Sequence, residues 1–292
     1  MDRIRKALDL ARLERSQSDD PRPGDPRAGD PRAGDARAGE RAAASLHEVQ
    51  SEFVAPLPAK AIAYTGTRVF TPQADVLERN RILSSGASDR AAAAFRMLRT
   101  QVLQRLDANG WRSLAVFSPG PNDGKTTTAV NLAVSLANDR LHTVLLVDFD
   151  FRRPTLAERL GLSPEFGSDD VLMGRAEVGD CLYHPENYDR LVIMPARAPL
   201  ENSSEILAGP RSRELVGELR NRYPERIILF DLPPVLSADD ALSFAPLVEC
   251  GLVVAAEGHT RRADLIRTIE LLHKTALVGT VLNRAAGVLP GY

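Results

Sequence analysis

The stretch that most constrains the fold of this chain is residues 113–137, which read SLAVFSPGPNDGKTTTAVNLAVSLA. A short apolar run is followed by a loop rich in Pro and Gly, and then by apolar residues at helical spacing. This pattern predicts a strand, a loop and a helix. Glycine lets such a loop approach an anion closely, and the first N–H groups of the helix favour negative charge. The stretch therefore predicts a phosphate-binding loop, with candidate residues Gly120, Asp123, Gly124, Lys125, Thr126 and Thr127.

Two side chains of this loop carry specific expectations. Lys125 would reach the β- and γ-phosphates of a nucleotide, and Thr126 would hold Mg²⁺. The strict P-loop pattern, however, asks for a glycine five residues before Gly124, and that position is Pro119. An ordinary glycine-containing turn between a strand and a helix is the alternative interpretation.

Composition and charge narrow the classes of protein that fit. A formal net charge of −2 gives no general attraction to nucleic acid. Cys181 and Cys250 are far apart and form no zinc-ligand pattern, which fits a reducing compartment. The sequence lacks an apolar run of about 18 residues, and its start does not lead into the apolar core of a signal peptide. We therefore expect a cytoplasmic protein that does not itself span a membrane.

The composition divides the chain into four parts. Residues 1–16 place their apolar side chains on one face of a short amphipathic helix. Residues 17–84 begin with Asp/Arg/Pro/Gly repeats that cannot bury a core. We expect them to form a disordered, low-complexity linker, of which residues 41–84 are loosely structured or partly packed on the domain. Residues 85–288 then form the folded domain, and residues 289–292 a tail.

Apolar runs alternate with helical patterns throughout the folded domain. A helix is expected from about Ser88, which would be its N-cap, with a buried stripe of Phe95, Leu98, Val102 and Leu106. Later strands are expected at residues 144–147, 190–196, 227–230, 250–258 and 276–284. Continuous apolar strands that alternate with helices indicate a parallel sheet covered on both faces. We expect an α/β fold with a doubly wound, mostly parallel sheet flanked by helices, and ligands beyond the carboxyl ends of its strands.

Aspartates follow two of the predicted strands. Asp148 and Asp150 end one strand, and Asp231 ends another. A single carboxylate in such a place is usually only a helix cap or a solvated turn. Near the phosphate loop, however, carboxylates are the hard oxygen ligands that Mg²⁺ bound to ATP takes. We expect Asp231 to hold a metal-bound water. Asp148 is expected beside the γ-phosphate, where it would contact Mg²⁺ and orient or deprotonate the attacking group.

Three motifs carry a resemblance to a known family: GPNDGKTTTAVNLA, VLLVDFDFRRP and IILFDLPP. Through these three motifs, residues 88–285 resemble the bacterial tyrosine kinases of exopolysaccharide and capsule synthesis. These kinases belong to a larger group of P-loop ATPases that includes the septum-site and plasmid-partition ATPases. The resemblance implies ATP and Mg²⁺ as cofactors. It implies catalytic roles for Lys125, Asp148, Asp150 and Asp231, metal binding by Thr126, Asp148 and Asp231, and nucleotide binding by the loop, Arg152 and, at adenine, Asn283.

The resemblance also carries expectations about regulation. Kinases of the family phosphorylate a C-terminal tyrosine cluster on themselves, and here Tyr292 stands alone as the expected acceptor. The family's oligomer-forming helix carries ExxRxxR, of which Arg96 and Arg99 match while the glutamate position is Ala93. The resemblance implies a homo-oligomer and a separate membrane-spanning activator, a Wzz-like polysaccharide co-polymerase. That activator would recruit the kinase to the inner face of the inner membrane.

The leading hypothesis is an ATP-dependent protein-tyrosine autokinase that regulates exopolysaccharide or capsule biosynthesis and export. The alternative is a nucleotide-switched assembly ATPase, similar to the septum-site and partition ATPases, that regulates polysaccharide export with little or no kinase activity. A DNA-binding partition ATPase would carry a lysine five residues before Lys125, where this chain has Gly120. We therefore expect no nucleic-acid partner.

Overall fold

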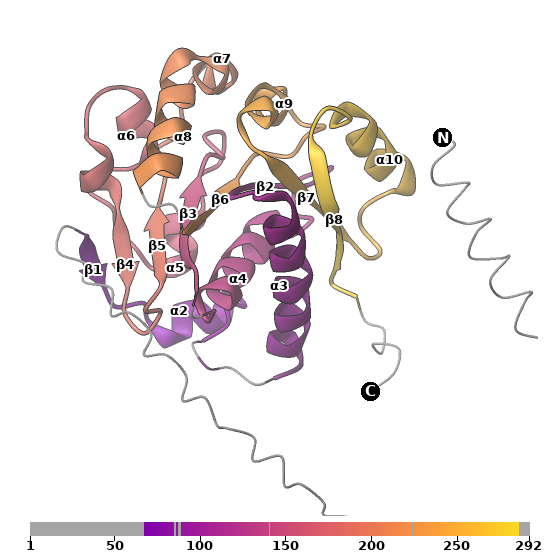
Figure 1. Ribbon diagram of the computed structural model, residues 1–292, viewed down its shortest axis with the longest axis horizontal. Helices are drawn as coiled ribbons and strands as arrows, with labels where there is room; N and C mark the ends of the chain where they lie inside the picture. The colour runs from indigo at the N-terminus through magenta and orange to yellow at the C-terminus, as the bar shows by residue number, and fades with distance from the viewer. Residues whose placement is uncertain (1–66, 85, 87–88, 140, 223–224, 286–292) are drawn as a thin grey trace, which may run out of the picture. The chain divides into compact units, whose positions relative to one another are not determined.

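The structure is a computed structural model that describes residues 67–84, 86, 89–139, 141–222 and 225–285 (Figure 1). Strands in this part of the chain form an eight-stranded sheet in the order β1-β4-β5-β3-β6-β2-β7-β8. Neighbouring strands are parallel except β4 and β5, which are antiparallel. The strands are β1 (Arg68–Phe70), β2 (Ser113–Phe117), β3 (Thr143–Asp148), β4 (Tyr183–Pro185), β5 (Leu191–Met194), β6 (Arg226–Asp231), β7 (Cys250–Ala256) and β8 (Ala276–Asn283). The expected α/β fold with a mostly parallel sheet is confirmed.

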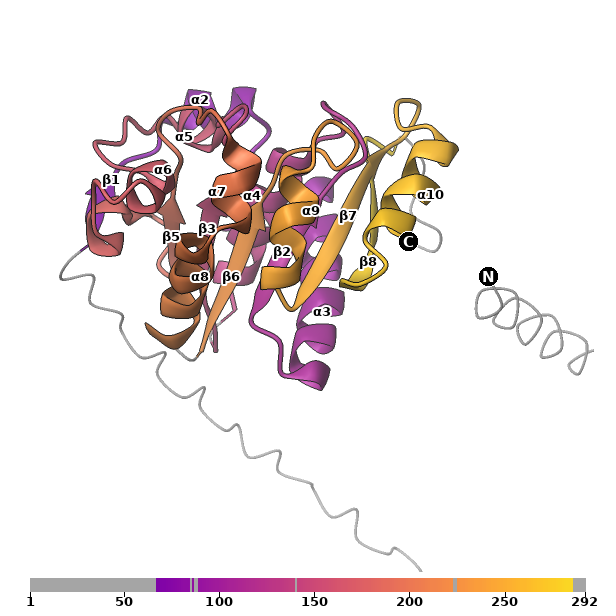
Figure 2. The same cartoon turned by 90° about the horizontal axis from the view of Figure 1, so that it is seen from above.

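Helices cover both faces of the sheet, with α3 and α4 on one side and α7, α8 and α9 on the other (Figures 1 and 2). The helices are α2 (Ala74–Arg79), α3 (Arg90–Asn109), α4 (Lys125–Ala137), α5 (Leu156–Leu160), α6 (Ser168–Leu172), α7 (Ser203–Ala208), α8 (Pro210–Arg222), α9 (Asp240–Phe244) and α10 (Arg262–Leu271). Short 3₁₀ turns lie at Val178–Cys181 and Ala245–Leu247. Among the described residues, none of these helices combines the length and the apolar character that a membrane crossing requires.

The central strands supply side chains to two hydrophobic cores, because successive residues of a strand point to opposite faces. In β2, Leu114 and Val116 pack with residues of α3 and α4, whereas Ala115 and Phe117 pack with residues of α8 and α9. All five residues of β2 are buried. Burial on both faces explains why this strand reads as a continuous apolar run rather than as an alternating one.

Helix α3 begins one residue later than the sequence indicated. Its N-cap is Asp89, whose carboxylate accepts the backbone N–H of Ala92 at 2.7 Å, and the expected cap at Ser88 is therefore wrong. Both residues are good caps, but the carboxylate satisfies a free N–H of the first turn directly. The helix buries Val102 and Leu106 as expected, whereas Phe95 and Leu98 of the predicted stripe are only half-buried.

The folded part of the chain starts before residue 84, which is earlier than the expected end of the linker. Strand β1 pairs with β4, and α2 buries Leu77 against the helices that cover the sheet. The side chain of Asn131 in α4 accepts the N–H of Leu83 and donates to the carbonyl of Arg81, each at 2.8 Å. Elements of three and six residues show no readable periodicity, because tertiary contacts rather than local pattern stabilise them. The predicted helix at residues 1–16, linker residues 17–66 and the tail lie outside the described residues.

Candidate nucleotide-binding site

The phosphate loop joins the carboxyl end of β2 to the start of α4, as the sequence predicts. Gly124 forms the N-cap of α4 in the left-handed conformation, at φ 87°. A Cβ atom at this position would lie 1.9 Å from the Nδ2 atom of Asn283. Only glycine satisfies both conditions, because other residues are strained at this φ and would collide with Asn283.

The three predicted motifs meet because their strands are neighbours in the sheet. Strand β6 lies between β2 and β3, with Val116 and Asp148 both paired to Asp231 across the ladder. The carboxyl ends of parallel strands lie at one edge of a sheet. Residues more than a hundred positions apart in sequence, such as Lys125 and Asp231, are thereby brought into contact.

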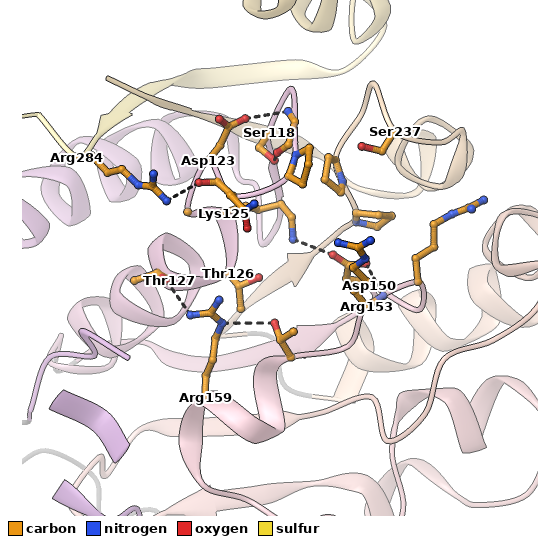
Figure 3. A pocket seen from close by; sticks show the side chains of 18 residues that line it. Ser118, Asp123, Lys125, Thr126, Thr127, Asp150, Arg153, Arg159, Ser237 and Arg284 are labelled. Atoms are coloured by element: carbon orange, nitrogen blue, oxygen red, sulfur yellow. Dashed lines mark hydrogen bonds and ion pairs between the residues drawn. The ribbon is translucent and has the colours of Figure 1, made fainter. Parts of the chain in front are cut away.

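Lys125, Thr126 and Asp231 form a compact cluster in which Lys125 and Asp231 are buried and Thr126 is half-buried. The Nζ atom of Lys125 lies 2.6 Å from Oδ1 of Asp231 and 3.5 Å from Oδ2 of Asp150. The hydroxyl of Thr126 donates to Oδ2 of Asp231 at 2.6 Å. The side chains of Lys125 and Asp231 are 6% and 1% exposed. Figure 3 shows Lys125 reaching across the site toward Asp150.

Burial and charge perturb the acid–base properties of this cluster. Burial by itself lowers the pKa of Lys125, but the charges of Asp231 and Asp150 outweigh it, and the net pKa is raised. Burial raises the pKa of Asp150, an effect that Lys125 only partly offsets. Burial and the nearby Asp231 charge raise the pKa of Asp148 well above the ordinary range. Perturbed carboxylates gathered at one edge of a sheet are typical of functional sites.

Asp148 faces the backbone rather than the open site. It is fully buried, and its two carboxylate oxygens accept the backbone N–H groups of Asp150 at 3.0 Å and Leu156 at 3.1 Å. In this arrangement it shapes the loop that follows β3. Its expected place beside the γ-phosphate stays a prediction, and reaching it would require these hydrogen bonds to break.

The alternating Asp-Phe-Asp-Phe sequence after β3 has a packing explanation. Phe149 and Phe151 are fully buried, with ring centroids 5.2 Å apart. Phe149 also packs against Phe230 and Phe244, with centroid distances of 5.4 Å and 5.0 Å. Aromatic pairs at such distances stabilise beyond the area that they bury. The phenylalanines therefore anchor the loop that carries the aspartates.

Asp123 and Asn283 brace the phosphate loop. The Asp123 carboxylate accepts the N–H of Gly120 at 2.8 Å and the hydroxyl of Thr260 at 2.5 Å. The Asn283 amide donates to the carbonyl oxygen of Asp123 at 2.9 Å, and Arg284 donates to a neighbouring loop carbonyl. Asn283 lines the adjoining groove beside α3 rather than the nucleotide cavity, and its adenine contact stays a prediction.

Arg152 is paired with a carboxylate at the start of α9. Its Nε atom donates to Oδ2 of Asp240 at 2.7 Å, and Asp240 is fully buried at the start of α9. Asp240 also accepts the hydroxyl of Ser203. Although Arg152 lines the cavity, its guanidinium is already paired with a carboxylate.

The cavity above the cluster measures about 560 Å³, within the range of small-molecule sites. Predicted residues that line it are Gly120, Asp123, Gly124, Lys125, Thr126, Thr127, Asp150 and Arg152. The sequence did not identify Arg153, Arg159 and Arg284, which also line it. Arg153 belongs to the VLLVDFDFRRP motif and Arg284 ends a predicted strand, but neither was assigned a role, whereas Arg159 stands in no motif. Only the folded chain shows that the three line one cavity. Tyr292 lies outside the described residues.

The donor set fits magnesium. The Thr126 hydroxyl and the Asp231 carboxylate are hard oxygen ligands held in contact at the start of α4. The described residues contain no group of three or more His, Cys, Asp or Glu side chains that forms a protein-only metal site. Mg²⁺ needs no such group, because it keeps several waters and takes ligands from nucleotide phosphates.

Comparison with known proteins agrees with this geometry. A family model described as an AAA domain matches residues 120–277. The tyrosine-protein kinase YwqD of Bacillus subtilis is 27% identical over 209 residues, which are 71% of this chain and 86% of that protein. The succinoglycan biosynthesis transport protein ExoP of Rhizobium meliloti is 30% identical, over 70% of this chain but only 26% of its own length.

Comparison with solved structures also finds a kinase of this kind. A solved VpsO kinase domain is 31% identical, with a TM-score of 0.59, and the match covers 67% of this chain and 95% of that domain. The family-model match, this solved domain and the three converging motifs agree. The chain therefore belongs to the bacterial tyrosine kinase family, a branch of the P-loop ATPases to which MinD proteins are also similar.

Proposed function

We propose that this chain is an ATP-dependent protein-tyrosine kinase that phosphorylates itself and regulates exopolysaccharide or capsule biosynthesis and export. The observation that carries the proposal is the contact among Lys125, Thr126 and Asp231 at a cavity of nucleotide size. Similarity to proteins named tyrosine kinases supports the choice of reaction. Phosphoryl transfer requires mainly positioning and charge neutralisation, which such a cluster supplies.

Each side chain has a distinct part in the proposed reaction. The N–H groups at the start of α4 and the Lys125 ammonium bind the phosphates, so Lys125 exchanges part of its contact with Asp231 for phosphate oxygens. Mg²⁺, when bound, would neutralise charge on the transferred phosphoryl group, and Thr126 and Asp231 would hold it. The tyrosine oxygen bonds to the γ-phosphorus as the bond to the β-phosphate oxygen breaks, and ADP leaves with that electron pair.

Asp150 is the carboxylate best placed to receive the tyrosine proton. It lines the cavity, whereas Asp148 lies behind it with both oxygens bonded to the backbone. Burial raises the pKa of Asp150, which makes it a better proton acceptor than an exposed carboxylate. Asp148 would then hold the loop in the reactive arrangement.

The described tyrosines are poor acceptors. Tyr183 donates its hydroxyl to the carbonyl of Phe166, and Tyr188 donates to that of Leu83; both side chains are buried. Phosphorylating either would require local unfolding. This leaves Tyr64, Tyr223 and Tyr292, outside the described residues, and we propose Tyr292 as the acceptor.

A nucleotide-switched assembly ATPase is the second candidate, favoured by the burial of both described tyrosines. Incubating the purified protein with Mg-ATP, then measuring phosphotyrosine by immunoblot and ADP by a coupled assay, separates the two. The kinase proposal expects phosphotyrosine in the wild type and none in Lys125→Met. ADP release without phosphotyrosine would favour the switch, and neither product would contradict both.

We further propose that a separate Wzz-like membrane-spanning protein recruits and activates the kinase at the inner face of the membrane. ExoP is far longer than this chain, so such relatives carry further sequence that this chain does not match. A homo-oligomer formed through α3 is also proposed. Arg96 is exposed on α3, whereas Arg99 donates to the carbonyl of Ser135 within the same chain. Phosphotyrosine measured with and without a candidate activator tests the recruitment.

A further inference from the structure

Arg159 enters the nucleotide cavity from a helix that the sequence motifs do not include. It lies near the end of α5 and is half-buried. Its Nη1 atom donates to the hydroxyl of Thr127 at 3.3 Å, and its Nε atom to the hydroxyl of Thr155 at 3.4 Å. Figure 3 shows the guanidinium beside the first turn of α4. A cation therefore lies against the helix end at which phosphates bind.

Among the described residues, the neighbouring cations Lys125 and Arg152 are paired with carboxylates, whereas the Arg159 guanidinium is not. Lys125 is paired with Asp231 and Asp150, and Arg152 with Asp240. Within the described part of the chain, the contacts found for the Arg159 guanidinium are two neutral hydroxyls at long hydrogen-bond distances. A guanidinium gains most from an anion that offers two oxygens. Arg153 also lines the cavity, but it is exposed and water competes for it.

Asn80, at the end of α2, holds the backbone of Arg159 in place. The side chain of Asn80, at the end of α2, donates to the carbonyl of Arg159 at 3.1 Å and to that of Val76 at 3.0 Å. At the other end of α5, Asp148 accepts the N–H of Leu156. Hydrogen bonds at both ends of α5 fix its backbone, and the two threonine hydroxyls orient the guanidinium. Less ordering entropy therefore opposes ligand binding.

We propose that Arg159 binds the phosphates of the nucleotide in the role that the sequence motif assigned to Arg152. This inference rests on the proposed function, since it presumes a nucleotide in the cavity. Lys125 would reach the β- and γ-phosphates, and Thr127, which the Arg159 guanidinium contacts, lies two residues further along α4. We therefore place Arg159 at the α-phosphate. ADP and ATP share the α-phosphate, and no bond to it forms or breaks in the transfer. Arg159 therefore contributes equally to the binding of both nucleotides, and not to the transfer step.

Calorimetric titration of Mg-ADP and of the magnesium complex of a non-hydrolysable ATP analogue tests this assignment on the full chain. Arg159→Met should weaken both nucleotides about tenfold or more, as expected for a lost charge-assisted hydrogen bond. Arg159→Lys should recover part of the loss. In turnover assays the KM for ATP should rise while kcat changes less than about twofold. Arg213→Met, an exposed arginine on α8 that does not line the cavity, is the matched control and should bind like wild type.

The outcomes separate the two proposals. Wild-type affinity in Arg159→Met, or a fall confined to kcat, would overturn the role of Arg159 while the nucleotide site stands. No heat from the wild type, or unchanged binding by Lys125→Met, would overturn the proposed function and Arg159 with it. If Arg159→Met does not fold, Arg159→Gln, which keeps hydrogen-bond donors toward the threonines without the charge, gives the same discrimination.

Discussion

Lys125 and Asp231 form an ion pair almost sealed from water, with 2.6 Å between Nζ and Oδ1 and side chains 6% and 1% exposed. The pair is both a structural element and the centre of the proposed phosphate site. A mutation at either residue therefore changes stability and activity together, and the two effects must be measured separately.

Lys125→Met should abolish nucleotide-dependent activity and also lower the free energy of unfolding. Removing one partner of a buried ion pair leaves an uncompensated charge, which typically costs about 3–5 kcal/mol. Urea unfolding measures this loss. Lys125→Met combined with Asp231→Asn should regain much of the stability and none of the activity. If the double variant is as unstable as the single one, Asp231 is not the charge that Lys125 compensates.

Asp148→Asn should flatten the pH dependence of stability. Burial raises the pKa of Asp148 in the folded protein above the value of about 3.9 expected in the unfolded chain. The folded state thus binds this proton more tightly, and its contribution to stability is complete below pH about 4 and is lost as pH rises through the raised pKa. Thermal melts of wild type and variant across pH 4–8 should diverge in slope, and parallel curves would contradict the raised pKa.

In enzyme assays, Asp148→Asn should lower kcat more than it weakens nucleotide binding. The asparagine amide replaces one acceptor oxygen with a donor, so it cannot accept both N–H groups that hold the loop after β3. Asp150 would then lose its position beside the cavity. Steady-state kinetics with calorimetry on the same preparation checks this, and a variant that loses only affinity would argue for a direct binding role.

Phe149→Ala should cost both stability and activity although the side chain touches no ligand. Its ring packs against three other buried phenylalanines, and truncating a buried aromatic ring typically costs about 3–5 kcal/mol. Phe149→Leu, which keeps most of the volume, should lose much less of both. Chemical denaturation and phosphotyrosine formation at a temperature where both variants are folded give the comparison.

Tyr292→Phe should remove most of the phosphotyrosine if the tail is the acceptor. Tyr183→Phe is the internal control, because the buried hydroxyl of Tyr183 bonds to the carbonyl of Phe166 and is not available to a kinase. Mass spectrometry of the intact and digested proteins locates the modification. An unchanged signal in Tyr292→Phe would move the acceptor to Tyr64 or Tyr223.

Sequence patterns predicted the fold and the centre of the candidate site for a definite reason. Continuous apolar runs mark buried parallel strands, and the residues that follow them must meet at one edge of the sheet. Lys125, Thr126 and Asp231 come together in this way. Each stands directly after a readable strand or loop, so local pattern was sufficient to find them.

Residues placed by tertiary contacts alone could not be predicted. Arg159 stands in no motif, and its position depends on where α5 packs. Arg152 pairs with Asp240, which lies 88 residues away at the start of α9. Nothing in the sequence around Asp240 marks it as that partner. Asn283 ends a predicted strand as expected, but its contact with the carbonyl of Asp123 follows from the close approach at Gly124.

The early start of the folded region has a practical meaning for anyone who shortens this protein. A recombinant fragment that begins at residue 85 would retain every nucleotide motif, yet it would strip β1 from β4 and uncover an unpaired strand edge. It would also leave the Asn131 amide without its two backbone partners and α5 without Asn80. Fragments intended for crystallisation or screening should therefore begin ahead of Arg68.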